Sequence, residues 1–357
     1  MCSAVIKNKM ISSAKPKKSL GQNFLTSVGA VNKIVDTAVE ATVKLEVGPP
    51  TGGTTSNFTV LEIGPGKGVL TKALLKKFEK VLAVEKDDNL FVELGEKFTK
   101  EIETGQLTLI HGDILELTPG KLGLISKNYA TVANLPYYIT GQFLRSWLET
   151  EFPPKFMVLM LQKEVAERIT ARDGKESLLS ISVKAYGEPK YIETIKRGSF
   201  YPIPNVDSAI LLINNISKEF FKRRGSEVSF IANPPLFPRA GKETSEPLLS
   251  PLVSAKESSP AITFSVHGKR GEFTTKVFSG QDLVVNQEKA FFNILRAGFA
   301  HKRKFLIKNL EDMSRLIGDP PERRQKLRKA FEVCEISPKA RAEDIKPEDW
   351  RCLAEKI

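Results

Sequence analysis

Cysteine and histidine are scarce in this chain of 357 residues, which contains three of each. The cysteines are odd in number, lie far apart and form no CxxC pair; they are Cys2, Cys334 and Cys352. We therefore expect neither a disulfide framework nor a cysteine-based zinc site. Three scattered histidines also argue against a histidine metal cluster, so we predict no metal site.

Long apolar runs are also missing. The stretch from Met1 to Lys18 has five lysines, no acidic residue and no apolar core of the kind that a signal peptide needs. No later run is long enough to span a bilayer. We expect a soluble protein in a reducing, cytoplasmic compartment, without a membrane partner.

Acidic residues are fewer than basic ones, because the chain has 42 Asp and Glu against 54 Lys and Arg, which gives a net charge of +12. This balance makes polyanions such as nucleic acid the first partners to consider, and the alternative is simply a soluble basic surface. The length favours two domains. A hydrophobic content of 41% argues against global disorder.

Residues 60–213 alternate short β-branched runs with longer amphipathic ones, which predicts an α/β domain with a mostly parallel sheet. Each apolar run is followed by a glycine or a polar residue, at the sheet edge where such folds bind ligands. Residues 217–280 are rich in Ser, Pro and Lys, with two short candidate strands at 261–266 and 272–277. Residues 287–357 are helical and basic in pattern.

The first motif, Glu62–Gly68, combines three glycines with a strand-to-helix junction. Glycines let a ligand approach the backbone, although a glycine turn without a ligand remains an alternative. Glu85, after the second run, is placed to accept hydrogen bonds from a ribose. The glycine spacing departs from GxGxxG, which favours a cofactor with a ribose and no pyrophosphate, such as S-adenosylmethionine. Asp113 would accept from the adenine amine, or serve as a helix N-cap.

The fourth run ends in Asn134-Leu135-Pro136-Tyr137. The amino nitrogen of adenine is a poor nucleophile, because its lone pair is delocalised into the ring. Acceptors on its two N–H bonds, the Asn134 side-chain oxygen and the Leu135 carbonyl, would favour the tetrahedral geometry that frees this lone pair. Pro136 constrains the turn, and Tyr137 offers a ring on which a base can stack. The alternative is a proline turn with one core tyrosine.

Seven motifs in this order resemble the KsgA/Dim1 family of ribosomal RNA adenine dimethyltransferases, whose relatives include the Erm methyltransferases and the mitochondrial transcription factor B proteins. Besides the segments above, they include residues 21–25, 84–87, 112–115, 162–168 and 200–208. The resemblance implies a Rossmann-like α/β methyltransferase domain with a small C-terminal all-α domain. The corresponding division is a basic arm at 1–18, a methyltransferase domain at 19–216, an insertion at 217–285 and a helical RNA-binding domain at 286–357.

The family implies roles for individual positions. Asn23 and Leu25 resemble the residues through which the N-terminal segment closes over S-adenosylmethionine. Gly64 resembles the contact to the methionine moiety, and Asn134 a residue shared between cofactor and target amine. Glu85 and Asp113 keep the ribose and adenine roles, while Tyr137 and Phe200 would hold the target base. Tyr138 and Ala133 depart from the family pattern, which leaves the shape of the base pocket open.

The C-terminal segment 299–310 is similar to the family's basic signature. We predict RNA contacts from Lys302, Arg303, Lys304 and Lys308, with the alternative of a solvated helix face for each. On a helix, Lys304 and Lys308 would share a face because they are four residues apart. The implied reaction is S-adenosylmethionine-dependent dimethylation of two adjacent adenosines near the 3′ end of small-subunit (16S) ribosomal RNA. The expected partner is an immature 30S particle and the expected state a monomer. The rivals are an Erm-like enzyme for large-subunit RNA and a factor that binds without turnover.

Overall fold

The computed structural model describes residues 16–17, 21–44, 58–124, 128–222, 262–267, 273–278, 280–312 and 320–357. Its centre is a seven-stranded sheet in the order β4-β3-β2-β5-β6-β9-β7. The strands are β2 (Thr59–Ile63), β3 (Lys80–Glu85), β4 (Leu107–His111), β5 (Tyr129–Asn134), β6 (Met157–Gln162), β7 (Glu188–Ile195) and β9 (Ser208–Asn214). The first five strands in chain order run parallel, and β9 is antiparallel to both β6 and β7.

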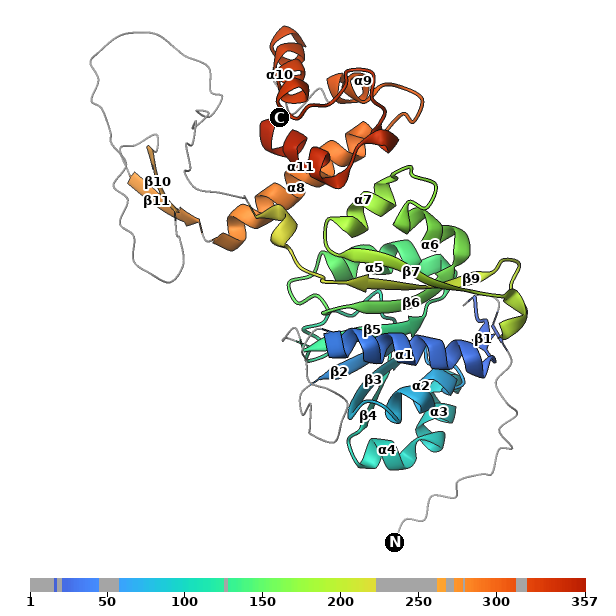
Figure 1. Cartoon of the computed structure of the whole chain (residues 1–357). Coiled ribbons are helices and arrows are strands. Elements are labelled where there is room, and N and C mark those ends of the chain that lie inside the picture. Colours follow the sequence, from blue (N-terminus) through green and yellow to red (C-terminus); the bar gives the residue numbers. More distant parts are fainter. Residues whose placement is uncertain are drawn as a thin grey trace.

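Helices cover both faces of the sheet (Figure 1). One hydrophobic cluster joins the sheet to α1 (Val28–Lys44), α2 (Val69–Leu75) and α3 (Asp88–Lys97), after which comes the short α4 (Thr99–Glu103). A second cluster packs α5 (Thr140–Leu148), α6 (Lys163–Thr170) and α7 (Leu178–Lys184) on the other face. The inner strands β2, β3, β5, β6 and β9 are buried on both sides, which is why they read as continuous apolar runs, whereas the edge strands β4 and β7 are partly exposed. The predicted α/β class is confirmed.

The parallel arrangement brings the ends of four strands to one edge. Ile63, Glu85, His111 and Asn134 are the last residues of β2, β3, β4 and β5. β9 begins at Ser208, which pairs with Gln162 at the end of β6, so residues 196–207 reach the same edge. A two-stranded ladder of β1 (Phe24–Leu25) and β8 (Phe200–Tyr201) holds the N-terminal segment there.

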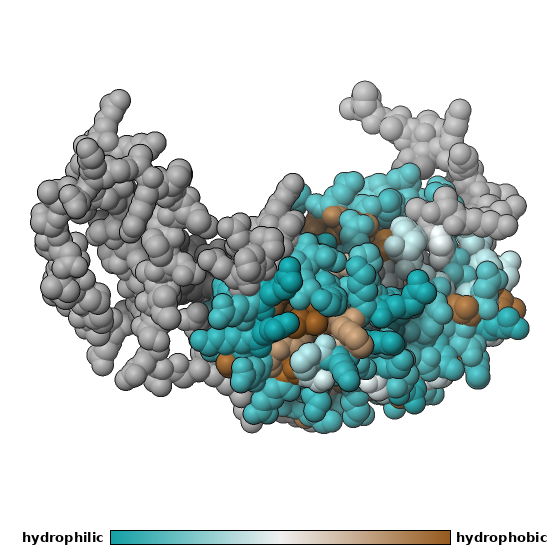
Figure 2. Space-filling view, turned by 90° about the horizontal axis from the view of Figure 1, so that it is seen from above, coloured by the Kyte–Doolittle hydropathy of each residue, from teal (hydrophilic) through white to brown (hydrophobic). Residues whose placement is uncertain are grey.

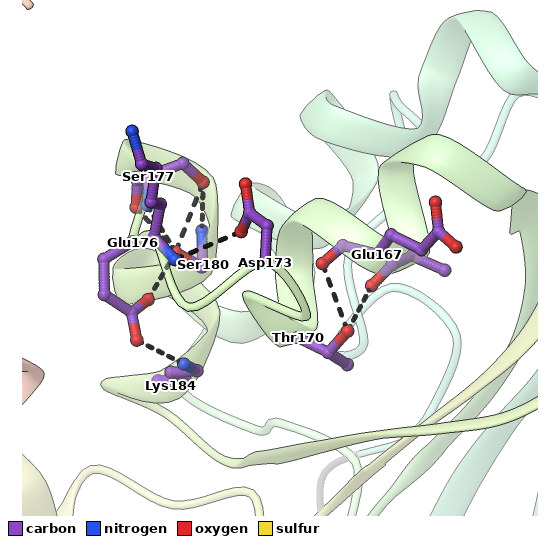
Figure 3. A network of polar contacts seen from close by, with 9 residues as sticks. Glu167, Thr170, Asp173, Glu176, Ser177, Ser180 and Lys184 are labelled. Carbon is purple, nitrogen blue, oxygen red and sulfur yellow. Dashed lines mark hydrogen bonds and ion pairs between the residues drawn. The ribbon is translucent and has the colours of Figure 1, made fainter. Parts of the chain in front are cut away.

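A polar network stabilises the junction between α6 and α7 (Figure 3). Ser177 caps α7, and Ser180 donates to the Glu176 carboxylate at 2.6 Å. Lys184 forms an ion pair with the same carboxylate. Glu176 N–H also donates to the Glu343 carbonyl at 2.9 Å, so this junction contacts the C-terminal region.

The C-terminal helices pack around a buried tryptophan. They are α8 (Gly280–Gly298), α9 (Leu306–Glu311), α10 (Pro320–Val333) and α11 (Pro347–Lys356), with a short 3-10 turn, η5 (Ala342–Asp344). Trp350 is fully buried and stacks on Phe299, and a Cβ on Gly298 would lie 2.2 Å from its ring. Asn309 donates to the carbonyls of Gly298 and His301 at 2.6 and 3.0 Å. This asparagine of the C-terminal signature therefore ties α9 to the end of α8. The predicted helical C-terminal region is confirmed.

The expectation about the cysteines is wrong for two of them. Cys334, just after α10, and Cys352, in α11, form a disulfide with an S–S distance of 2.00 Å. They are 18 residues apart in sequence, but helix packing brings their Cα atoms to 5.8 Å. The spacing of the cysteines in the sequence does not indicate this proximity, because it depends on how the helices pack.

The segment between the two regions is described in part. The strands β10 (Ile262–His267) and β11 (Phe273–Phe278) form an antiparallel pair, one residue later than the predicted strands. Phe221, in the short turn η4 (Glu219–Phe221), is buried and lies 5.6 Å from the ring of Phe291. The predicted boundary at residue 286 falls inside α8, and most of the predicted insertion and basic arm lies outside the described residues.

In the described ranges, no helix has both the length and the apolar character that crossing a membrane requires.

Candidate functional site

A cavity lies at the sheet edge where β2, β3, β4 and β5 end. It brings together nine of the residues predicted for the site. They are Asn23, Leu25, Gly64, Glu85, Asp113, Asn134, Leu135, Pro136 and Tyr137. These residues come from five separate motifs spread over 115 positions from 23 to 137, and the parallel sheet is what unites them.

The glycine turn between β2 and α2 forms one wall of this cavity. Gly64, Gly66 and Gly68 have positive φ angles of 61°, 59° and 71°, which glycine adopts without steric cost. A Cβ on Gly64 would meet no atom within 4 Å, whereas one on Gly68 would lie 2.5 Å from the Phe98 ring. Gly64 thus leaves open space beside the backbone, and Gly68 permits close packing.

Glu85 has a carboxylate that is almost fully buried and aimed at the glycine turn. Its Oε2 accepts from Gly66 N–H at 3.0 Å, and its Oε1 accepts from Asp87 N–H at 2.9 Å. Burial raises the pKa of Glu85, although these backbone bonds oppose the rise. The Lys86 backbone N–H also lowers the pKa of this carboxylate, and of its roughly four acceptor directions at least one remains for a ribose hydroxyl.

Asp113 lies opposite, after β4. Its Oδ1 accepts from Leu115 N–H at 3.0 Å within a turn. No helix begins between β4 and β5 in the described residues, so the alternative interpretation of Asp113 as a helix N-cap is wrong. Its Oδ2 lies 2.6 Å from the Lys86 Nζ. Burial by itself would raise the pKa of Asp113, but the bond from Lys86 and the backbone bond outweigh it and hold this pKa below its usual value.

Asn134 ends β5 beside the cavity. Its Nδ2 donates to the Asn23 carbonyl at 3.2 Å, which fixes the orientation of the side-chain amide. Among the described residues, no donor contacts its Oδ1. This acceptor is therefore available to a ligand.

The three residues that follow Asn134, residues 135–137, form a tight turn. Leu135 N–H donates to the Met160 carbonyl at 3.0 Å, which anchors the turn to β6. Pro136, at φ −56°, precedes the 3-10 turn η2 (Tyr137–Ile139). Tyr137 shares a 2.9 Å hydrogen bond with Ser208 Oγ, and burial raises its pKa. The phenol is thus tied to β9 while its side chain lines the cavity.

The N-terminal segment closes one side of the cavity through contacts that the sequence did not indicate. Lys17 Nζ lies 2.9 Å from the Asp87 carboxylate, and Gln22 donates to the same oxygen at 3.1 Å. Asp87 also caps α3. Burial by itself would raise the pKa of Asp87, but the bonds from Lys17 and Gln22 outweigh it, so this pKa lies below its usual value. Sequence reasoning assigned no role to Lys86, which lines the cavity, or to Asp87, which holds the N-terminal segment beside it. Their position next to Glu85 was the available signal.

Phe200 is placed differently from the other predicted residues. Its side chain is 3% exposed, belongs to the core that contains α1, and does not line the cavity. The next residue, Tyr201, is 62% exposed. A stacking role for Phe200 stays a prediction, and it would require the ring to leave the core.

Glu62 is a buried acid in the wall of the cavity. Neither carboxylate oxygen is within hydrogen-bond geometry of a donor. Desolvation raises the pKa of Glu62 to about 8, although the nearby Thr71 opposes this rise. Between the ordinary pKa of an unfolded glutamate and pH 8, the folded chain holds a proton that the unfolded chain has lost. Stability therefore falls as pH rises through this window.

Replacing Glu62 with glutamine keeps the shape and removes this titration. We expect the E62Q variant to gain stability over the wild type as pH rises from 5 to 8, by about 1.4 kcal/mol per pH unit at most. Thermal unfolding of both proteins between pH 5 and pH 8 measures this difference in stability. A constant difference between the two proteins would contradict a neutral, buried Glu62.

The predicted RNA-binding residues lie together before and within α9. Lys302, Arg303, Lys304 and Lys308 are all exposed. Lys304 and Lys308 are near Asp312 and Glu311 at 3.3 and 2.9 Å, whereas no acidic partner of Lys302 or Arg303 is found in the described residues. Lys304 precedes the first residue of α9, so the expectation that it shares a helical face with Lys308 is wrong.

Further cations surround this surface. Lys302 lines a second cavity, of 520 Å³, together with Arg168 of α6 and Arg296 of α8. The exposed residues of α10 include Arg324, Lys326, Arg328 and Lys329. Figure 2 shows a largely hydrophilic face with only small hydrophobic areas. The hydropathy of this face fits a polar partner. The exposed cations of α9, α10 and their surroundings, among the described residues, favour an anionic one.

Comparison with known proteins places this site in context. Residues 13–228 match the family model described as ribosomal RNA adenine dimethylase. A protein of Dehalococcoides mccartyi named ribosomal RNA small subunit methyltransferase A is 45% identical over 199 residues, which are 56% of this chain and 62% of that protein. A protein of the same name from Streptococcus sanguinis is 31% identical over 347 residues, or 96% of this chain and 91% of the relative.

Solved structures show a similar fold. A dimethyladenosine transferase from Plasmodium falciparum has a TM-score of 0.59 at 20% identity, covering 92% of this chain and 95% of its own. The 23S rRNA methyltransferase ErmE has a TM-score of 0.56 at 20% identity, and the match covers 94% of this chain and 99% of the ErmE chain. The Rossmann-like methyltransferase fold with a helical C-terminal region is thus confirmed.

Proposed function

Because this chain belongs to the ribosomal RNA adenine dimethylase family, we propose that it is an S-adenosylmethionine-dependent methyltransferase for adenosine in small-subunit ribosomal RNA. The observation that carries the proposal is the meeting of Glu85, Asp113 and Asn134 around one cavity. Their free acceptors match the donors of a ribose, an adenine amine and a target amine. The glycine turn leaves room beside the backbone at Gly64.

The residues of the cavity define how the reaction proceeds. When bound, S-adenosylmethionine supplies an electrophilic methyl group. Asn134 Oδ1 and the Leu135 carbonyl accept the two N–H bonds of the target amine, which turns its lone pair toward that group. Tyr137 holds the base by stacking. After attack the amine is cationic and loses its proton to water, so positioning rather than a general base accounts for catalysis.

The substrate side of the proposal is more specific. We infer that two adjacent adenosines near the 3′ end of the small-subunit RNA are each methylated twice, within an immature small-subunit particle, by a monomer. The names of the relatives support small-subunit RNA as the substrate, and the description of the family supports dimethylation of adenine. The exposed cations near α9 support contact with RNA. The ribosomal substrate supports a cytoplasmic location, whereas the paired cysteines no longer do.

The decisive experiment is mass spectrometry of RNA after incubation with labelled S-adenosylmethionine. Immature small-subunit particles and naked large-subunit RNA serve as competing substrates. We expect dimethyladenosine at adjacent positions of the small-subunit RNA only. Label in the large-subunit RNA would favour an Erm-like enzyme, and absence of label in both would favour a factor that binds without turnover.

A triple substitution tests the RNA surface. Replacing Lys302, Arg303 and Lys304 with glutamine should weaken RNA binding about tenfold or more at moderate salt and reduce the salt slope by about two. The cause is the loss of phosphate contacts and of the counterion release that accompanies them. Filter binding at several salt concentrations measures both quantities.

The matched control removes three exposed lysines from the other region, Lys72, Lys76 and Lys77 of α2 and its end. It changes net charge equally, so it should lower affinity only slightly. Equal effects of the two triple variants would show that net charge, and not this surface, binds RNA.

A further inference from the structure

Lys86 and Asp113 meet at the rim of the cavity. β3 and β4 are parallel neighbours with Glu85 paired to His111, so the residues that follow these strands are side by side. The Lys86 Nζ lies 2.6 Å from Asp113 Oδ2, and both side chains line the cavity. The contact joins positions 27 residues apart.

The remaining contacts of Asp113 limit what else it binds. A carboxylate has about four acceptor directions. Leu115 N–H uses one on Oδ1 and Lys86 uses one on Oδ2, which leaves further directions on both oxygens. The Asp113 side chain is 19% exposed, so a ring seated there would remove its remaining water. A bound counter-charge lowers the cost of that step, because a buried carboxylate is expensive only when unpaired.

We propose that Lys86 is a positioning residue that holds Asp113 as an ionised acceptor, so that the site selects a 6-amino purine over a 6-oxo purine. The inference rests on the proposed function, which makes S-adenosylmethionine the cofactor. An amino purine directs an N–H donor at the carboxylate. A 6-oxo purine directs oxygen lone pairs at it, and an ionised carboxylate repels them. An unpaired Asp113 would take up a proton more readily and then accept either ring.

Calorimetry with two ligands tests this role. S-Adenosylhomocysteine carries the amino purine and S-inosylhomocysteine the oxo purine. We expect the wild type to prefer the first, and Lys86→Met to weaken its binding about tenfold while changing the second much less. Lys86→Arg should restore most of the preference, because it keeps the charge. Lys76→Met, an exposed lysine at the end of α2, is the matched control and should equal the wild type.

The outcomes separate this inference from the proposed function. If Lys86→Met weakens both ligands equally, or leaves the preference unchanged or larger, then Lys86 does not act through Asp113 and the inference fails alone. If the wild type binds neither ligand, the proposed cofactor is wrong and the inference falls with it. A thermal melt of each variant confirms folding, which the half-exposed position of Lys86 favours.

Discussion

Replacing Asn134 with alanine is expected to slow methyl transfer about a hundredfold to a thousandfold, with RNA affinity nearly unchanged. Asn134 holds the one side-chain acceptor in the turn that is free to orient the target amine. Losing a group preorganised toward the reacting atoms has an effect of this size. Single-turnover rates at saturating cofactor isolate this step from binding.

Asn128 provides the matched control. It precedes the first residue of the same strand, β5, and is exposed, so Asn128→Ala alters the same residue type at the other end. This variant should transfer methyl groups at the wild-type rate. An Asn134→Ala variant as fast as Asn128→Ala would remove Asn134 from the mechanism.

Glu85→Ala should weaken binding of S-adenosylhomocysteine by about a hundredfold or more. The substitution removes the proposed acceptor for the ribose diol. It also leaves the N–H groups of Gly66 and Asp87 without their partner, so the glycine turn loses its support. Calorimetry measures the loss.

Two further variants serve as a matched control and as a second test of Glu85. Glu79→Ala changes an exposed glutamate just before the same strand, β3, and should bind like the wild type. Glu85→Gln keeps the volume of the side chain but turns an amide donor toward one of the two N–H groups, so it should also bind weakly. Wild-type affinity in both Glu85 variants would contradict the ribose assignment.

Sequence reasoning located most of the candidate site because the site is built from strand ends. Gly64, Glu85, Asp113 and Asn134 each follow or end a β-branched run, and parallel strands bring their carboxyl ends to one edge. The motif order then identified the family. Neither step requires knowledge of how distant side chains pack.

Other features depended on that packing. Phe200 shares a motif with exposed neighbours, yet its ring is buried in the core that also contains α1 residues, and its strand β8 pairs with β1. Asn309 looked like part of a binding signature and in fact ties α9 to α8. The bond between Cys334 and Cys352 arises where α10 and α11 meet.

The sequence by itself determined the α/β class, the order of the motifs and the residues that end the central strands, because these follow from hydrophobic periodicity and local turn chemistry. Only the tertiary structure decided how those residues are paired. The Lys17–Asp87 and Lys86–Asp113 ion pairs join positions 70 and 27 residues apart. Such contacts depend on strand register and side-chain direction, which local patterns do not encode, and they set the charge and acceptor geometry of the site.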